Sequence, residues 1–357
     1  MSTKVIKIGK KIIDFKSKCF IVAEISANHG GKIENAYALI RAAKKSGADA
    51  VKLQTYTADT ITLNSKKKDF LIKNHSPWSY RKNLWSLYNK AKTPLEWHEK
   101  LFKFAKKLNL VIFSSPFDEN AVDFLEGFGC PAYKLASQEI NHIPLIKKIA
   151  STKKPIIIST GLCSKEEVSK AVRIIRGLNN NKIIILKCTS SYPATSKELN
   201  LLTIKDIKKS YNVIPGFSDH TLGYTSSIVA VMLGAKLIEK HISLPKKNSV
   251  DSFFSTNVND FELMVHEIRE AENSVGKIDY KPSKNSKKQH YAGRRSIYVV
   301  KNIGKGEKFT KHNIKVIRPH YGLMPKFYDQ ILNKISKKKL APGTRMKLKY
   351  IKKNNEK

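Results

Sequence analysis

Two histidines at matching places in the sequence are the clearest sign of chemistry. The segments Gly216–His220 (GFSDH) and Ile238–His241 (IEKH) each end a predicted strand with a histidine. If the strands are parallel neighbours, both imidazoles emerge at the same edge of one sheet. A single histidine at a strand end is more often a satisfied polar residue than a ligand, but a matched pair favours a metal site. The pair His220 and His241 suits Mn²⁺, Fe²⁺, Co²⁺ or Zn²⁺, and Mg²⁺ where the other ligands are oxygen. No third protein ligand is obvious, which leaves a position where substrate could bind a Lewis acid.

Lysines, hydroxyl groups and carboxylates stand at the ends of the other predicted strands. They are Glu24, Lys52, Gln54, Ser115, Lys134, Ser137, Glu139, Ser159, Ser190, Tyr192 and Ser218. Lys52 and Lys134 lie inside otherwise apolar strands, where a charge is costly unless something anionic pairs with it. A phosphate ligand is one such partner. A structural ion pair with Glu24 or Glu139 is the alternative.

The elements that must position these groups are short apolar runs alternating with helical patterns, as in parallel βα units. The predicted strands are residues 20–26, 50–56, 111–117, 132–137, 155–161, 182–190, 213–220 and 237–244. Eight such units in succession predict a closed (β/α)₈ barrel, in which working residues sit at the C-terminal ends of the strands. Capping patterns at Thr93–Glu96 (TPLE) and Ser164–Glu167 (SKEE) mark two helix starts.

One connection is unusually long and aromatic. Residues 57–93 include Trp78, Tyr80, Trp85 and Tyr88, which is too aromatic for a linker. The segment is either a lid over the barrel mouth or a packed surface subdomain.

The barrel pattern stops near residue 280. We predict a barrel domain over residues 1–280, a Lys- and Ser-rich linker over 281–292, and a small β-rich domain over 293–357. The last of these is marginal for folding alone, so it is expected to lean on a partner.

Composition excludes several classes of protein. The chain has 357 residues, is 41% hydrophobic and carries a formal net charge of +38. The basic residues are mainly lysines spread along the chain, which argues against a specific nucleic-acid partner but leaves attraction of an anionic substrate open. Apolar stretches are too short to cross a membrane. We expect no export signal, and four cysteines without a pairing pattern favour a reducing cytoplasmic location.

Several motifs, in order along nearly the whole chain, resemble those of the sialic acid synthase family. They are Ala23–His29 (AEISANH), Lys52–Tyr56 (KLQTY), Phe113–Phe117 (FSSPF), Tyr133–Ser137 (YKLAS), Ser159–Gly161 (STG), Gly216–His220 and Glu239–His241 (EKH). The resemblance implies a (β/α)₈ barrel followed by an antifreeze-protein-like (SAF) domain. It also implies a transferase that condenses phosphoenolpyruvate with an amino sugar.

Further segments are most similar to the branch of the family that makes pseudaminic acid, a sugar that decorates bacterial flagellins. They are Thr57–Leu63 (TADTITL), Leu84–Tyr88 (LWSLY), Thr93–His98 (TPLEWH) and Arg318–Tyr328 (RPHYGLMPKFY). The implied sugar is 2,4-diacetamido-2,4,6-trideoxy-altrose. The alternatives are an N-acetylneuraminate or legionaminate synthase, which sugar preference would distinguish. A basic polyanion-binding barrel is a further alternative, and it would keep its binding when His220 and His241 are replaced.

The resemblance also implies site roles. His220 and His241 hold a divalent metal, usually Mn²⁺ with Mg²⁺ or Co²⁺ as alternatives, against the sugar aldehyde, and Glu24 and Glu139 orient or deprotonate water or sugar hydroxyls. Residues similar to those around phosphoenolpyruvate are Lys52, Ser115, Lys134, Ser137, Ser159, Ser190 and Ser218. Gln54, Tyr192 and Asp251 resemble further substrate-site positions. Arg318 resembles an arginine that contacts the sugar from the neighbouring subunit of a domain-swapped homodimer.

Overall fold

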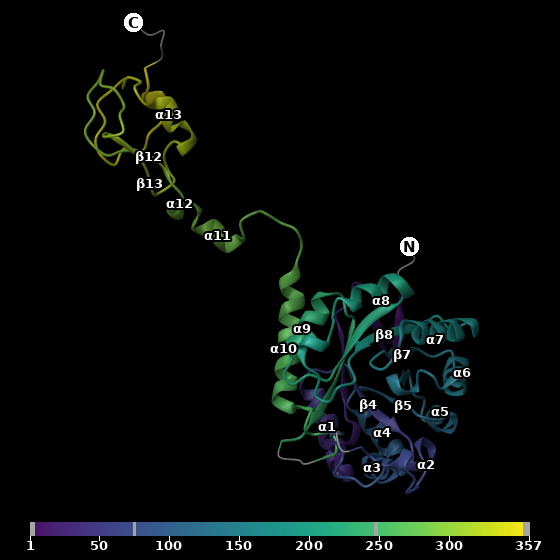
Figure 1. Cartoon of the computed structure of the whole chain (residues 1–357). Coiled ribbons are helices and arrows are strands. Elements are labelled where there is room, and N and C mark those ends of the chain that lie inside the picture. The colour runs from purple at the N-terminus through teal and green to yellow at the C-terminus, as the bar shows by residue number, and fades with distance from the viewer. Residues whose placement is uncertain (1–3, 74–75, 246–248, 353–357) are drawn as a thin grey trace. The chain divides into compact units, whose positions relative to one another are not determined.

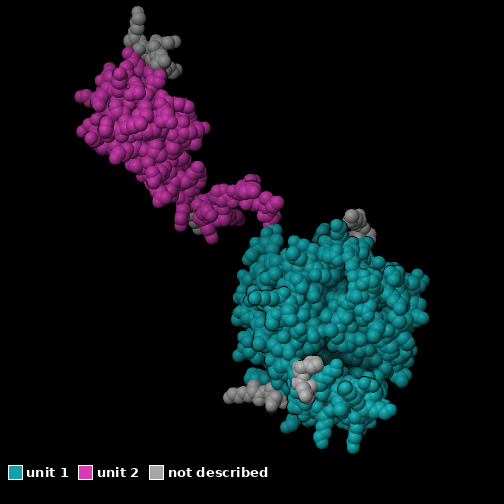
Figure 2. Space-filling view, viewed as in Figure 1, with its two compact units in different colours: residues 1–276 teal, residues 277–357 magenta. Residues whose placement is uncertain are grey.

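The computed structural model describes residues 4–73, 76–245 and 249–352. The chain forms two compact units, residues 1–276 and residues 277–357, which are coloured separately in Figure 2. The predicted insertion includes residues 74 and 75, and the predicted C-terminal domain includes residues 353–357, all of which lie outside the described residues.

The first unit is the predicted barrel. Its strands are β3 (Phe20–Glu24), β4 (Ala50–Thr55), β5 (Val111–Pro116), β6 (Tyr133–Leu135), β7 (Ile156–Ser159), β8 (Ile183–Cys188), β9 (Ile214–Asp219) and β10 (Leu237–Ser243). Each strand pairs in parallel with the next, and β10 pairs with both β9 and β3, which closes the sheet. All eight predicted strands are therefore confirmed. A two-residue strand, β11 (Thr256–Asn257), adds to the end of β10.

Helices follow the strands and surround them (Figure 1). The longer ones are α1 (Ile33–Lys45), α3 (Leu84–Ala91), α4 (His98–Lys107), α5 (Glu119–Glu126), α6 (Ile143–Ser151), α7 (Lys165–Gly177), α8 (Thr203–Tyr211), α9 (Thr225–Met232) and α10 (Val258–Val275). Ser164 and Glu167 form the predicted capping box of α7. The predicted start at Thr93–Glu96 is wrong by one turn, because Leu95–Trp97 form a separate 3₁₀ turn and α4 begins at His98.

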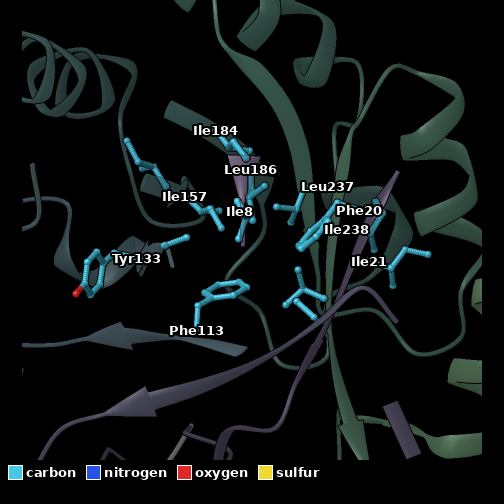
Figure 3. Packing of buried hydrophobic residues seen from close by; sticks show 14 of the residues in the cluster. Ile8, Phe20, Ile21, Phe113, Tyr133, Ile157, Ile184, Leu186, Leu237 and Ile238 are labelled. Carbon is cyan, nitrogen blue, oxygen red and sulfur yellow. The ribbon is translucent and has the colours of Figure 1, made fainter. Parts of the chain in front are cut away.

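An N-terminal hairpin lies at the opposite end of the barrel from the predicted site. Strands β1 (Ile6–Ile8) and β2 (Lys11–Ile13) pair antiparallel. Lys11 binds Asp49, just before β4, and a side chain added at Gly9 would meet Val111, the first residue of β5. Ile8 is fully buried with side chains of the strands, as Figure 3 shows. The hairpin therefore covers the N-terminal ends of the strands.

The barrel interior is packed with branched and aromatic side chains. Phe113, Ile157, Ile184 and Leu237 come from four different strands and form part of one buried cluster (Figure 3). Such packing fills the lower part of the barrel, so any cavity must lie at the C-terminal ends of the strands.

The long connection between β4 and α4 folds into short elements. They are α2 (Ala58–Ile61), η2 (Lys68–Phe70) and α3. The indole of Trp85 donates to Asp59 at 2.8 Å, which ties α3 to α2. The indole of Trp78 donates to the Val250 carbonyl at 3.0 Å, which ties the connection to the loop after β10.

The second unit has its own small core. Strands β12 (Ser296–Val299) and β13 (Ile314–Ile317) pair antiparallel, and single bridges link further extended segments. The remaining elements are α11 (Lys284–Lys288), α12 (His290–Gly293), η6 (Pro325–Phe327), α13 (Tyr328–Ile331) and η7 (Leu348–Tyr350). Ile297, Phe309, Ile314 and Met346 are fully buried in its centre. Two short helices thus occupy the segment predicted as a linker. In the part of the chain that the structure describes, no helix is long and apolar enough to span a bilayer.

Candidate active site

A cavity of about 380 Å³ opens at the C-terminal ends of the barrel strands. It brings together most of the site residues predicted from the sequence. Those that line it are Lys52, Gln54, Ser115, Lys134, Ser137, Glu139, Ser159, Tyr192, Ser218, His220, His241 and Asp251. The cavity is therefore built where the alternation of strands and helices predicts it.

Two buried lysines face the lower end of the cavity with unequal compensation. Lys52 Nζ lies 3.0 Å from Glu24 Oε2 and 3.2 Å from Glu239 Oε1. Lys134 Nζ donates to Ser159 Oγ at 2.6 Å, and it lies 3.9 Å from Glu239 Oε1. The predicted ion-pair alternative is thus right for Lys52 and Glu24. For Lys134 the neighbouring carboxylate is that of Glu239 on the facing strand β10, and not that of Glu139.

The pKa shifts follow from this geometry. Burial lowers the pKa of Lys52, but Glu239 and Glu24 outweigh burial and raise it above its usual value. Burial lowers the pKa of Lys134 below its usual value, because Glu239 at 3.9 Å offsets burial only in part and Lys52 adds to the lowering. Burial likewise raises the pKa of Glu24 to about 7, against the opposing effect of Lys52. The ammonium of Lys134 is therefore less compensated than that of Lys52, and an anionic ligand beside it would favour its charged form.

Glu24 does not line the cavity. Its carboxylate is fully buried behind Lys52 and accepts a hydrogen bond from Gln54 Nε2 at 3.2 Å. Glu139, by contrast, lines the cavity, and burial raises the pKa of its carboxyl. Of the two carboxylates predicted to be catalytic, Glu139 lines the cavity and Glu24 does not.

The two histidines meet at the rim as predicted. Their ring centroids are 5.4 Å apart. His220 Nδ1 lies 2.8 Å from the Thr189 carbonyl, which can only accept, so Nδ1 carries a proton and Nε2 is the nitrogen that can ligate a metal. Burial lowers the pKa of His220, but the neighbouring Cys188 outweighs burial and raises it, so metal binding at Nε2 would release a proton. Burial, with His220 and Lys52 as cationic neighbours, holds the pKa of His241 well below its usual range, so this imidazole is neutral.

These features fit a bound metal ion. Neutral imidazoles are the form that ligates metals. His241 Nδ1 is buried and has no hydrogen-bond partner among the described residues, a state that a bound group would relieve. The described residues contain no group of three or more His, Cys, Asp or Glu able to hold a metal.

Strand alternation explains which neighbours of the histidines reach the cavity. Ser218, His220, Glu239 and His241 line it. Asp219 and Lys240 point the other way and form a buried ion pair of 2.9 Å behind the strands. Glu239 is a site residue that the sequence analysis missed, although counting back two residues from His241 would have found it.

Three predicted residues do not line the cavity. Glu24 lies behind it, and Ser190 Oγ lies 3.1 Å from Ser137 Oγ. Arg318 is exposed in the second unit, and its predicted role remains a prediction. Tyr192, a predicted site residue, packs on His220 with ring centroids 4.5 Å apart. Phe254 packs on both histidines and was not predicted from the sequence.

A closed parallel barrel with cations and paired imidazoles at its C-terminal mouth is typical of barrel enzymes that act on anionic small molecules. The chain belongs to the NeuB family, whose profile matches residues 39–280, and the SAF domain profile matches residues 294–344. The predicted family resemblance and fold class are confirmed.

Characterised relatives cover nearly the whole chain. It is 45% identical to a pseudaminic acid synthase of Campylobacter jejuni, over 92% of this chain and 96% of the relative. It is 34% identical to the N,N'-diacetyllegionaminic acid synthase of Legionella pneumophila, over 93% and 94%. Among solved structures, the spore coat polysaccharide biosynthesis protein SpsE of Bacillus subtilis matches with a TM-score of 0.66 at 30% identity, covering 99% of this chain and all of that one.

Proposed function

We propose that this chain is a pseudaminic acid synthase, which condenses phosphoenolpyruvate with 2,4-diacetamido-2,4,6-trideoxy-altrose and water to give pseudaminic acid and phosphate. The observation that carries the proposal is the 45% identity to pseudaminic acid synthases over 92% of the chain, against 34% for the legionaminic relative. The cavity supports it, because its cations and imidazoles match an anionic reactant and an aldehyde.

In this reaction C3 of phosphoenolpyruvate forms a bond to the aldehyde carbon, water adds at C2, and the C–O bond to phosphate breaks. Lys134, with Ser159 beside it, is placed to bind the phosphate or carboxylate of phosphoenolpyruvate. Lys52 is held rigidly by Glu24 and Glu239 and adds a second cation whose charge is largely balanced. The two lysines thus position the anion without an excess of buried positive charge.

His220 and His241 would hold a divalent metal ion, with Mn²⁺ as the first choice. Such an ion supplies Lewis acidity toward the sugar aldehyde oxygen. The chain's own contribution is to fix the imidazoles: the Thr189 carbonyl sets the tautomer of His220, and Tyr192 and Phe254 pack against the rings.

Glu139 is one of three carboxylates that line the cavity, with Glu239 and Asp251, and we assign proton transfer to it. Burial raises the pKa of Glu139, which brings it toward the range where a carboxyl exchanges protons near neutral pH. We assign Glu139 to the attacking water or a sugar hydroxyl. Glu24 acts as a positioning residue through Lys52 and Gln54.

The decisive assay measures phosphate release from phosphoenolpyruvate with Mn²⁺, offering the diacetamido-altrose and N-acetylmannosamine separately and identifying products by mass. Release with the altrose supports the proposal. Release with N-acetylmannosamine alone would keep the chemistry and overturn the substrate. Release with neither would refute the enzymatic proposal.

We further propose that the protein is a cytoplasmic, domain-swapped homodimer in which Arg318 completes the partner subunit's site. The exposed guanidinium of Arg318 supports this, because it offers several donors in fixed geometry. Mixing inactive Arg318→Ala with inactive His241→Ala subunits in equal amounts tests it. If the arginine acts in trans, each mixed dimer has one intact site, and about a quarter of the activity should return because about half of the dimers are mixed. No restoration in subunits shown to exchange would refute the swap.

A further inference from the structure

The cavity has a polar part and an apolar part, and the two parts are lined by different segments of the chain. The barrel strands and the loops that follow them contribute mainly charged and polar groups, including Lys52, Lys134, Glu139 and the two histidines. Side chains from the connection between β4 and α4 are different. Those that line the cavity are mostly apolar, namely Ile61, Ile72, Leu84, Leu87, Tyr88 and Ala91, and we call these six residues the apolar wall. None of the described lining residues from this connection carries a charge.

The apolar wall is a fixed part of the barrel mouth. Asn83 caps α3 through a capping box with Ser86 and so fixes the start of the helix that carries Leu84. Leu87 is almost completely buried. The hydrogen bonds from Trp85 to Asp59 and from Trp78 to the Val250 carbonyl hold the wall to α2 and to the loop after β10. A wall held at both sides presents a defined surface to whatever enters the cavity.

We propose that the apolar wall is the specificity element for the sugar, and that it selects sugars bearing methyl groups over sugars bearing hydroxyls. This inference rests on the proposed function. The diacetamido-trideoxy sugar carries two acetyl methyl groups and a C6 methyl group. N-acetylmannosamine carries hydroxyls at C4 and C6 instead. A hydroxyl set against apolar side chains loses its hydrogen bonds to water without replacement, which disfavours its binding.

The expected discrimination between the two sugars can be estimated from that of other apolar pockets. A single methyl or methylene group in an apolar pocket discriminates by roughly 10- to 200-fold. The wall should therefore favour the diacetamido sugar over N-acetylmannosamine by on the order of 100-fold in affinity. It should be indifferent to changes in configuration that keep the methyl groups, because dispersion and burial of apolar area are not directional.

Binding can be separated from turnover by using reduced sugars. The alditols of the two sugars lack the aldehyde and cannot condense, so their dissociation constants can be measured by calorimetry in the presence of phosphoenolpyruvate and Mn²⁺. The test variant is Leu84→Gln. Its matched control is Leu63→Gln, the same change in the same connection at a side chain that is 61% exposed and does not line the cavity. Ile61→Gln serves as a second wall variant if Leu84→Gln does not fold.

We expect the wall variant to reduce the preference for the diacetamido alditol about tenfold while the control keeps it. An unchanged preference in a folded wall variant, or equal affinity of the wild-type protein for both alditols, would overturn the inference. Phosphate release by the wild-type protein with the unreduced sugars is measured alongside. Absence of phosphate release with the diacetamido-altrose refutes the proposed function, whereas the alditol preference decides the role of the wall by itself.

Discussion

Replacing each buried lysine by methionine should produce opposite effects on stability and on ligand binding. Lys52 lies within 3.2 Å of both Glu24 and Glu239, so Lys52→Met leaves Glu24 buried without its cation. Breaking a buried ion pair by removing one partner costs about 3–5 kcal/mol. Lys134 lies 3.9 Å from Glu239, and that carboxylate keeps Lys52 when Lys134 is removed. Lys134→Met should therefore lower the free energy of unfolding by only about 1 kcal/mol or less.

For binding of phosphoenolpyruvate the expected order is the reverse, with the larger loss in Lys134→Met. A hydrogen bond to a charged group contributes about 1.5–3 kcal/mol, so losing the Lys134 ammonium should weaken binding by roughly 10- to 150-fold.

The loss of stability in Lys52→Met should also depend on pH. Burial raises the pKa of Glu24 to about 7, and without Lys52 it rises further. The unpaired carboxyl then stays protonated in the folded protein but ionises in the unfolded chain. Between pH 7 and 8.5 the free energy of unfolding of the variant should therefore fall by up to about 2 kcal/mol more than that of the wild type.

Urea unfolding followed by tryptophan fluorescence measures the stability of the barrel unit, because all three tryptophans, at positions 78, 85 and 97, lie within residues 1–276. Calorimetric titration with phosphoenolpyruvate measures binding. Equal destabilisation by the two variants would refute the unequal compensation of the lysines. Unchanged phosphoenolpyruvate affinity in a folded Lys134→Met variant would refute its role as the anion-binding cation.

Three further outcomes are expected. Dialysis against a chelator should abolish phosphate release, with Mn²⁺ restoring it in the wild type but not in a His220→Ala/His241→Ala variant; full activity after dialysis would contradict the metal site. Burial lowers the pKa of His29 to about 4. Its neutral form therefore stabilises the fold at pH 7.5, and about 2 kcal/mol of that stability should disappear as the pH falls to 5, a slope that His29→Gln should flatten in pH-dependent unfolding. Finally, Gly216→Ala would place a Cβ 2.6 Å from a backbone oxygen of β10 and should lower the free energy of unfolding in urea by about 1–3 kcal/mol. Gly177→Ala, with open space around the added Cβ, is the control and should leave that free energy unchanged. Equal effects of the two changes would refute the packing argument.

Much of the fold could be predicted because it depends on local pattern. Parallel strands covered on both faces appear as continuous apolar runs, and the polar residues that end them, such as Lys52 and His241, mark the rim. Relations across the barrel could not be predicted in this way. The carboxylate near Lys134 comes from β10, more than a hundred residues away in the sequence, and periodicity carries no information about such pairs.

The long connection after β4 shows the same limit. Its aromatic content indicated that it packs near the mouth, but which of its side chains face the cavity depends on tertiary contacts such as that between Trp78 and Val250. The start of α4 was misplaced because Pro94 initiates a 3₁₀ turn there, and a capping pattern alone does not distinguish the two kinds of helix.

The hairpin at the N-terminal ends of the strands has a kinetic consequence. With Ile8 filling that end, reactants enter and leave the cavity by the same opening, above the histidines. Lys52 and Lys134 are almost completely buried, whereas side chains of the apolar wall such as Leu84 are partly exposed, so a sugar bound first would stand in the path of phosphoenolpyruvate. The architecture therefore favours compulsory-order kinetics in which phosphoenolpyruvate binds before the sugar, with inhibition by excess sugar as its signature.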